Sequence, residues 1–205
     1  MKCEHVEQEP VDREKTGPAF RLHVYDGPES ATTVIDITES TLDQALEAAR
    51  TFSHDDEKLW SLELVVGPPG SGLIWLSGCD YHRLPGSASD WRQRKEMQDR
   101  YLSARSRRGL APVLPNGLRV IRLFPEWAEI HPLWESFTDN YPTTGAALGL
   151  STGLSDALYA WNSAWSDRDL DSDLPEGWED HGWELYTALQ SELDGVAEVR
   201  PEFGF

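Results

Sequence analysis

The chain has 205 residues, and 39% of them are apolar, including nine tryptophans, so its apolar side chains suffice for a well-packed core. A formal net charge of −18 opposes binding to nucleic acid, whose phosphates carry the same sign. Two cysteines are too few for a disulfide framework, residues 1–10 lack the apolar stretch of a secretory signal, and no apolar run reaches the length of a membrane span. We therefore expect a cytoplasmic protein that binds neither nucleic acid nor membrane.

The negative charge is concentrated in the C-terminal part of the chain. Residues 125–205 contain seventeen acidic side chains but only two arginines, Arg168 and Arg200, which leaves −15 of the total. Such a surface favours a basic partner, because opposite charges accelerate encounter, although the same charge can also serve solubility alone.

The first third of the chain predicts a tail, a hairpin and a helix. Residues 1–18 are polar and show no periodicity, which predicts a flexible tail. Alternating apolar and polar side chains predict a strand over residues 19–25, and a β-branched run predicts its hairpin partner over residues 33–37. An apolar stripe at helical spacing follows, and either Ser40 or Thr41 can cap the start of this helix.

The middle of the chain predicts a second hairpin, a basic helix and a further strand. Strands are expected over residues 59–66 and 73–76, on either side of the glycine-rich segment 67–72. Residues 90–108 contain seven basic side chains and no glycine or proline, which predicts a helix whose charges face solvent or pair with the acidic half. Alternation over residues 118–124 predicts the last strand of the first half.

The C-terminal part has the periodicity of two helices. The aromatic stripe of the first helix is interpreted as core, with a partner surface as the alternative. The second helix is expected over residues 176–193, and a short apolar run over residues 196–199 could add an edge strand. The stripe of the first helix consists of Leu154, Leu158, Trp161 and Trp165.

These elements predict an α+β fold, with a mainly antiparallel sheet packed against a C-terminal helical pair. We expect a flexible tail over residues 1–18, an α+β sheet domain over residues 19–124 and an acidic helical segment over residues 125–205. The helical segment should pack on the sheet as one globular unit, because each element has an apolar face to bury.

Two short motifs suggest a chemistry that their context does not support. Segment 67–72 superficially resembles a phosphate loop, but it lacks the lysine and the following helix, so a hairpin turn is favoured. Cys79 and His82 place a thiol and an imidazole just past a strand, but a buried structural cysteine is the preferred interpretation. The six histidines show no zinc-ligand spacing, and we predict no catalytic residue, metal or cofactor.

The acidic residues after the first C-terminal helix alternate in a way that resembles a calcium loop. Counted from Asp169, however, the sixth position is Leu174 rather than glycine, and the twelfth is Asp180 rather than glutamate. A solvated acidic linker that caps the following helix is therefore favoured over a metal site. A recognition surface is expected beside this linker, and the candidate partner-binding residues are Asp167, Asp169, Asp171, Asp173, Glu176, Glu179 and Asp180.

Three motifs in about the last 75 residues resemble a group of uncharacterised proteins from high-GC Gram-positive bacteria. They are Pro-Leu-Trp at residues 132–134, Leu-Ser at residues 150–151 before a helix, and Trp-Asn-x-x-Trp at residues 161–165. This resemblance implies no particular activity. The first half of the chain is similar to small immunity proteins of bacterial toxin systems.

The leading hypothesis is a non-enzymatic binding protein of the immunity or antitoxin kind, whose acidic surface masks a basic protein partner. One alternative is an enzyme that uses the Cys79/His82 region. Another is a housekeeping module with no dedicated ligand surface. The sequence leaves the oligomeric state open.

Overall fold

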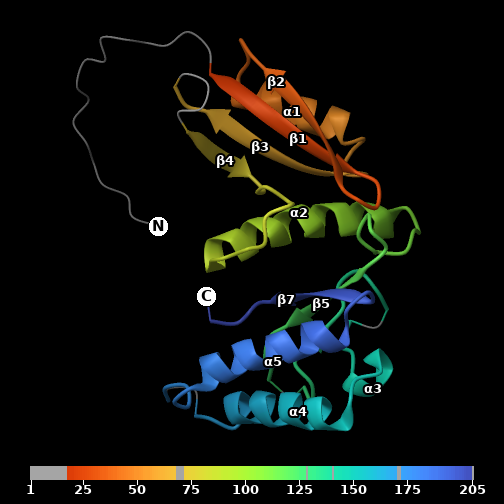
Figure 1. Cartoon of the computed structure of the whole chain (residues 1–205), viewed down its shortest axis with the longest axis vertical. Coiled ribbons are helices and arrows are strands. Elements are labelled where there is room, and N and C mark those ends of the chain that lie inside the picture. The colour runs from red at the N-terminus through yellow and green to blue at the C-terminus, as the bar shows by residue number, and fades with distance from the viewer. Residues whose placement is uncertain (1–17, 68–71, 128, 140, 170–171, 205) are drawn as a thin grey trace, which may run out of the picture.

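Two β-sheets lie on opposite sides of the long helix α2 (Ala88–Arg107) in the computed structural model of the chain (Figure 1). The predicted α+β fold, with a mainly antiparallel N-terminal sheet and a C-terminal helical pair, is confirmed. Of the tail expected over residues 1–18, only Pro18 lies within the described residues. The structure describes residues 18–67, 72–127, 129–139, 141–169 and 172–204.

The first sheet is antiparallel throughout and has the strand order β2-β1-β3-β4. Its outer pairs are the two predicted hairpins, β1 (Ala19–Asp26) with β2 (Ala31–Ile37) and β3 (Leu59–Val65) with β4 (Leu73–Ser77). The glycine-rich segment 67–72 therefore connects two antiparallel strands, as predicted, although residues 68–71 lie outside the described residues.

Helix α1 (Leu42–Phe52) covers one face of the first sheet. Of the two predicted capping residues, Thr41 is the one used: its hydroxyl accepts the backbone N–H of Gln44 at 3.3 Å, and the Gln44 side chain accepts the backbone N–H of Thr41 at 2.9 Å. The two buried alanines of α1, Ala45 and Ala49, let the helix approach the strands closely. The core on this face consists of Phe20, Leu22, Val24, Ala45, Ala49, Trp60 and Leu62.

Helix α2 covers part of the opposite face of the first sheet. It packs against β3 and β4, and its Met97, Tyr101 and Leu102 form a core cluster with Tyr25 and Leu59. The end of this face where β1 and β4 begin lies away from α2 (Figure 1).

The second sheet is mixed and has the strand order β6-β5-β7. Strand β5 (Arg119–Leu123) pairs antiparallel with β6 (Leu133–Trp134) and parallel with β7 (Ala197–Pro201). The strands predicted over residues 118–124 and 196–199 therefore both form, and they are neighbours in one sheet. Strand β5, which the sequence analysis assigns to the first half of the chain, therefore pairs with strands of the C-terminal part.

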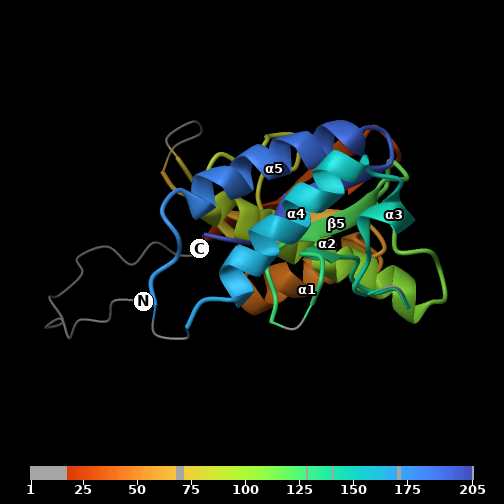
Figure 2. The same ribbon diagram turned by 90° about the horizontal axis from the view of Figure 1, so that it is seen from below.

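Helices α4 (Thr152–Ser166) and α5 (Trp178–Glu192) cover the face of the second sheet that points away from α2, and the short α3 (Gly145–Leu148) precedes α4 (Figure 2). The predicted stripe is core at Leu158 and Trp161, which are 0% and 2% exposed. Trp165, the last member of the stripe, is only partly buried.

Ion pairs join the second sheet to α2. Arg94 donates to both carboxylate oxygens of Glu198, at 2.7 and 2.9 Å, and Glu202 accepts hydrogen bonds from Lys95 and Arg122. Burial alone would raise the pKa of Glu202, but the hydrogen bonds from Arg122 and the other basic side chains lower it to about 2. The basic helix thus pairs with the acidic half, one of its two expected roles.

Candidate functional site

The candidate partner-binding residues form an exposed connection between α4 and α5. Asp167 is the C-cap of α4, while Glu179 and Asp180 lie in the first turn of α5, where carboxylates are favoured by the helix dipole. None of the described carboxylates of this connection is in an ion pair within the described part of the chain, and Asp171 lies outside it. Those that are described and exposed are Asp167, Asp169, Asp173, Glu176, Glu179 and Asp180.

An exposed aromatic pair lies beside the start of this connection. The rings of Trp127 and Trp165 are 4.7 Å apart, and Trp127 is 37% exposed. The guanidinium of Arg168 lies 4.3 Å from the Trp165 ring centroid and 5.2 Å from that of Trp127, and it donates to the backbone carbonyl of Trp165. The arginine is therefore held against the two rings.

Asn162 fixes the loop that carries Trp127. Its buried side chain donates to the backbone carbonyl of Glu129 at 2.7 Å and accepts the backbone N–H of Glu126 at 3.2 Å. This brings Glu129 and Ile130, both exposed, to the same end of the molecule as the C-terminal end of α4. We call the whole area the acidic–aromatic surface, defined by Trp127, Glu129, Ile130, Trp165, Asp167, Arg168, Asp169, Asp173 and Glu176.

The aromatic part of this surface is absent from the sequence-based prediction. Trp127 lies far from Trp165 in the sequence, in a segment with no periodicity, so no spacing pattern connects them. The Trp-Asn-x-x-Trp motif does contain both Asn162 and Trp165, and Asn162 is the residue that holds the loop of Trp127 in place.

The Cys79/His82 region has the geometry of a structural site. The Cys79 thiol is buried and donates to the sulfur of Met97 at 3.8 Å, and burial raises its pKa to about 11. Nε2 of His82 is instead hydrogen-bonded to Thr32 Oγ1 at 2.8 Å. The structure therefore does not bring the thiol and the imidazole together as nucleophile and base.

Among the described residues, no group of three or more His, Cys, Asp or Glu side chains is arranged to hold a metal ion. The described carboxylates of the acidic connection form no such group either. Calcium ligands have to converge on one point, and the described carboxylates of the connection do not.

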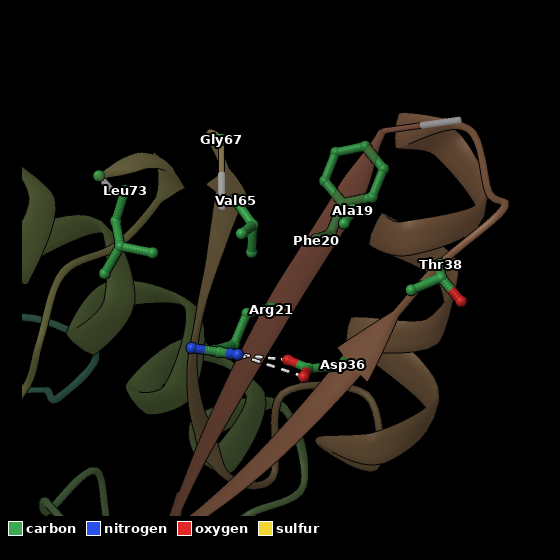
Figure 3. A pocket seen from close by; sticks show the side chains of 9 residues that line it. Ala19, Phe20, Arg21, Asp36, Thr38, Val65, Gly67 and Leu73 are labelled. Atoms are coloured by element: carbon green, nitrogen blue, oxygen red, sulfur yellow. Dashed lines mark hydrogen bonds and ion pairs between the residues drawn. The ribbon is translucent and has the colours of Figure 1, made fainter. Parts of the chain in front are cut away.

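A cavity of about 470 Å³ lies on the open part of the first sheet, at one end of its strands (Figure 3). Arg21 and Asp36 face each other there, with Nε to Oδ1 at 2.7 Å and Nη2 to Oδ2 at 3.2 Å. Val65 and Leu73 add apolar walls. The hydrogen bond from Arg21 holds the pKa of Asp36 below its usual range, so Asp36 is ionised at neutral pH.

Glu63 lies beside this cavity, in register with Arg21 across β1 and β3. Its side chain is 1% exposed, and neither carboxylate oxygen has a hydrogen-bond partner among the described residues. The nearest basic nitrogens are Nε2 of His23 at 3.2 Å and Nε of Arg21 at 3.9 Å. Burial of a carboxylate without hydrogen bonds is unfavourable, so Glu63 stands out among the buried residues of this sheet.

Comparison with known proteins found no match to the chain: no protein-family model, no curated protein and no solved structure matches it. Within the residues that the structure describes, no helix is both long enough and apolar enough to cross a membrane.

Proposed function

We propose that the chain is a non-enzymatic, cytoplasmic binding protein of the immunity or antitoxin kind, and that its acidic–aromatic surface masks a basic protein partner. One observation carries the proposal: the carboxylates at the α4–α5 connection are exposed and unpaired within the described residues, while most basic side chains elsewhere are engaged in internal ion pairs. These carboxylates therefore present a group of unpaired negative charges at this end of the molecule.

The internal ion pairs explain why so little positive charge offsets these carboxylates. Exposed pairs contribute little to stability but still neutralise each other in the field of the molecule. The acidic connection has no such partners in the described chain. The basic side chains that form ion pairs are Arg21, Arg50, Lys58, Arg94, Lys95, Arg100, Arg108, Arg119, Arg122 and Arg200.

The aromatic pair can supply binding energy, which charge alone provides only weakly. Charge accelerates encounter and selects the sign of the partner, whereas buried aromatic and arginine contacts provide most of the binding energy of an interface. Trp127 and Trp165, with the guanidinium of Arg168 against both rings, have this composition, and the carboxylates around them would form the polar rim. A basic partner with an apolar anchor residue fits this arrangement.

The test is a comparison of two variants that change the net charge by the same amount. The surface variant carries Asp167→Asn, Asp169→Asn, Asp173→Asn and Glu176→Gln. The control variant carries Asp43→Asn, Asp156→Asn, Asp194→Asn and Glu39→Gln, at exposed carboxylates outside the acidic–aromatic surface. Each protein, including the unchanged chain, is used to capture binding proteins from an extract of its native host at low and at high salt.

We expect the unchanged chain and the control variant to retain the same basic protein at low salt, and the surface variant to lose it. Capture should also decrease at high salt. The proposal fails if no basic protein is retained, or if both variants retain it equally. In that case the carboxylates serve solubility, as in a housekeeping module.

A further inference from the structure

Both edges of the second sheet are closed to further strands by the chain itself. Along β7, the side chain of Gln190 donates to the backbone carbonyl of Ala197 at 3.0 Å and accepts the backbone N–H of Val199 at 2.8 Å. Strand β6 has only two residues, and its Trp134 forms a β-bridge to Pro142. Such features keep a sheet edge from pairing with a strand of another molecule.

The two edges of the first sheet differ from each other. Strand β4 has five residues, and its register with β3 shifts partway along, which makes it a poor template for a further strand. Strand β2 has seven residues and pairs one-to-one with β1 from Ala31 to Ile37. Among the described residues, only those of β1 hydrogen-bond to its backbone. Strand β2 is therefore a regular edge with unpaired backbone groups along its outer side.

The composition of β2 favours pairing with another strand. Five of its seven residues are β-branched, and it contains no glycine, proline or lysine. Its one charged side chain, Asp36, is already hydrogen-bonded to Arg21 of β1. Helix α1 packs mainly on β1 and β3, so β2 keeps an exposed side chain such as Val34, which is 52% exposed.

The sequence of β2 is complementary to itself in an antiparallel arrangement. A twofold axis through Val34 pairs all seven residues of one copy with the seven of a second copy. Val34 then faces Val34 of the second copy, and Asp36 faces Thr32 of the second copy, so no like charges meet. The register that brings the two Asp36 side chains opposite each other would pair only residues 35–37 and is disfavoured.

The net charge of the chain opposes self-association least at this edge. Residues 125–205 carry −15 of the net charge of −18, which leaves −3 for residues 1–124. The α4–α5 connection lies at the opposite end of the long axis of the molecule from β2 (Figure 1). Two copies joined at β2 would therefore hold their acidic ends apart by far more than the screening length of about 8 Å at physiological salt.

We propose that the β2 edge is a dimer interface, at which the β2 strands of two copies of the chain pair antiparallel about Val34 and join their first sheets into one. A seven-residue strand spans only about 23 Å, so the interface is small and the dimer reversible. The acidic–aromatic surface lies elsewhere and stays free in the dimer. The proposal therefore does not depend on the proposed function.

The test is the oligomeric state of the unchanged chain, measured by sedimentation between about 1 µM and about 1 mM. We expect a monomer–dimer equilibrium with a dissociation constant of about 100 µM. Amide hydrogen exchange over residues 31–37 should slow as the protein concentration rises, while exchange over residues 73–77 of β4 should not change. Salt should strengthen the dimer, because it screens the repulsion between two acidic chains.

Two lysine variants at equally exposed positions locate the interface. Val34→Lys places two positive charges opposite each other across the twofold axis and should weaken dimerisation at least about 10-fold. Ile74→Lys makes a similar change on the other edge strand, β4, where Ile74 is also 52% exposed, and should leave dimerisation unchanged. Val34→Glu should be as defective as Val34→Lys, whereas a mixture of the two should associate because opposite charges then face each other.

The proposal is overturned if the unchanged chain stays monomeric up to about 1 mM. It is also overturned if Ile74→Lys weakens the dimer as much as Val34→Lys does, or if the mixture associates no better than its components. Slow exchange over residues 31–37 at every concentration would contradict it too, because the edge would then be covered within one chain. Should Val34→Lys fail to fold, which its amide spectrum would show, sedimentation and exchange of the unchanged chain still decide the outcome.

Discussion

Trp161 and Trp178 each donate the indole N–H to the backbone carbonyl of the other, at 2.9 and 3.0 Å, and their rings stack at 4.4 Å. Trp161 lies in the last turns of α4 and Trp178 is the first residue of α5. The reciprocal pair therefore clamps the two ends of the acidic connection together. Two residues of the C-terminal core therefore hold in place the segment that carries the exposed carboxylates.

Loss of one half of this clamp should destabilise the protein. Trp161→Phe keeps an aromatic ring but removes the indole N–H that the carbonyl of Trp178 accepts in the core, which should reduce the free energy of unfolding by about 2 kcal/mol. Denaturant unfolding measures this change. Trp165→Phe, at a partly exposed position, should cost less than about 1 kcal/mol. Equal losses in the two variants would contradict the role of the clamp.

The ion pair between α2 and β7 should be essential for joining the two sheets. Arg94→Met leaves the partly buried Glu198 with one donor, Gln98, in place of three hydrogen bonds, and should lower the free energy of unfolding by about 3 kcal/mol. Arg50→Met removes the exposed pair with Glu47 and should cost under about 0.5 kcal/mol. Chemical denaturation of both variants checks the contrast, and a small effect at Arg94 would refute it.

Stability should fall in acid through Glu202. Its pKa is about 2 in the folded protein against 4.5 for an unperturbed glutamate, so its contribution is present above about pH 4.5 and is lost as the pH falls toward 2. The difference corresponds to about 3 kcal/mol. Unfolding measured between pH 6 and pH 2 should show a shallower decline for Glu202→Gln than for the unchanged chain. Parallel curves would rule out this assignment.

Cys79 should react slowly with thiol reagents. A pKa of about 11 leaves roughly 100-fold less thiolate near neutral pH than the usual value of 9.0 does, and burial restricts access further. The rate of alkylation by iodoacetamide, measured in a Cys3→Ser background, should rise by at least about 100-fold on unfolding. A native rate close to the unfolded one would revive the enzyme alternative.

Local pattern was sufficient to predict most elements of this fold. The alternation of β1 and β3, the apolar stripe of α1 and the aromatic stripe of α4 each depend on residues close together in the sequence. Pairing between distant segments was beyond such patterns. The parallel pairing of β5 with β7 joins residues near 120 to residues near 200, and nothing in either strand specifies the other.

The same limit applies to the candidate sites. The exposed acidic connection was predicted, because a run of carboxylates without apolar spacing stays in solvent. The contact of Trp127 with Trp165 and Arg168 could not be predicted in this way, because it depends on the tertiary contact that Asn162 makes with the loop of Trp127. The cavity of the first sheet is lined by residues of all four strands, so predicting it required the pairing of strands that lie far apart in the sequence.

The most direct test of the proposed function is the dissociation constant of the captured basic protein, measured with purified components for the unchanged chain, the surface variant and the control variant. The account predicts at least about 10-fold weaker binding for the surface variant, little change for the control, and weaker binding of all three at high salt. Equal dissociation constants for the surface and control variants would contradict it.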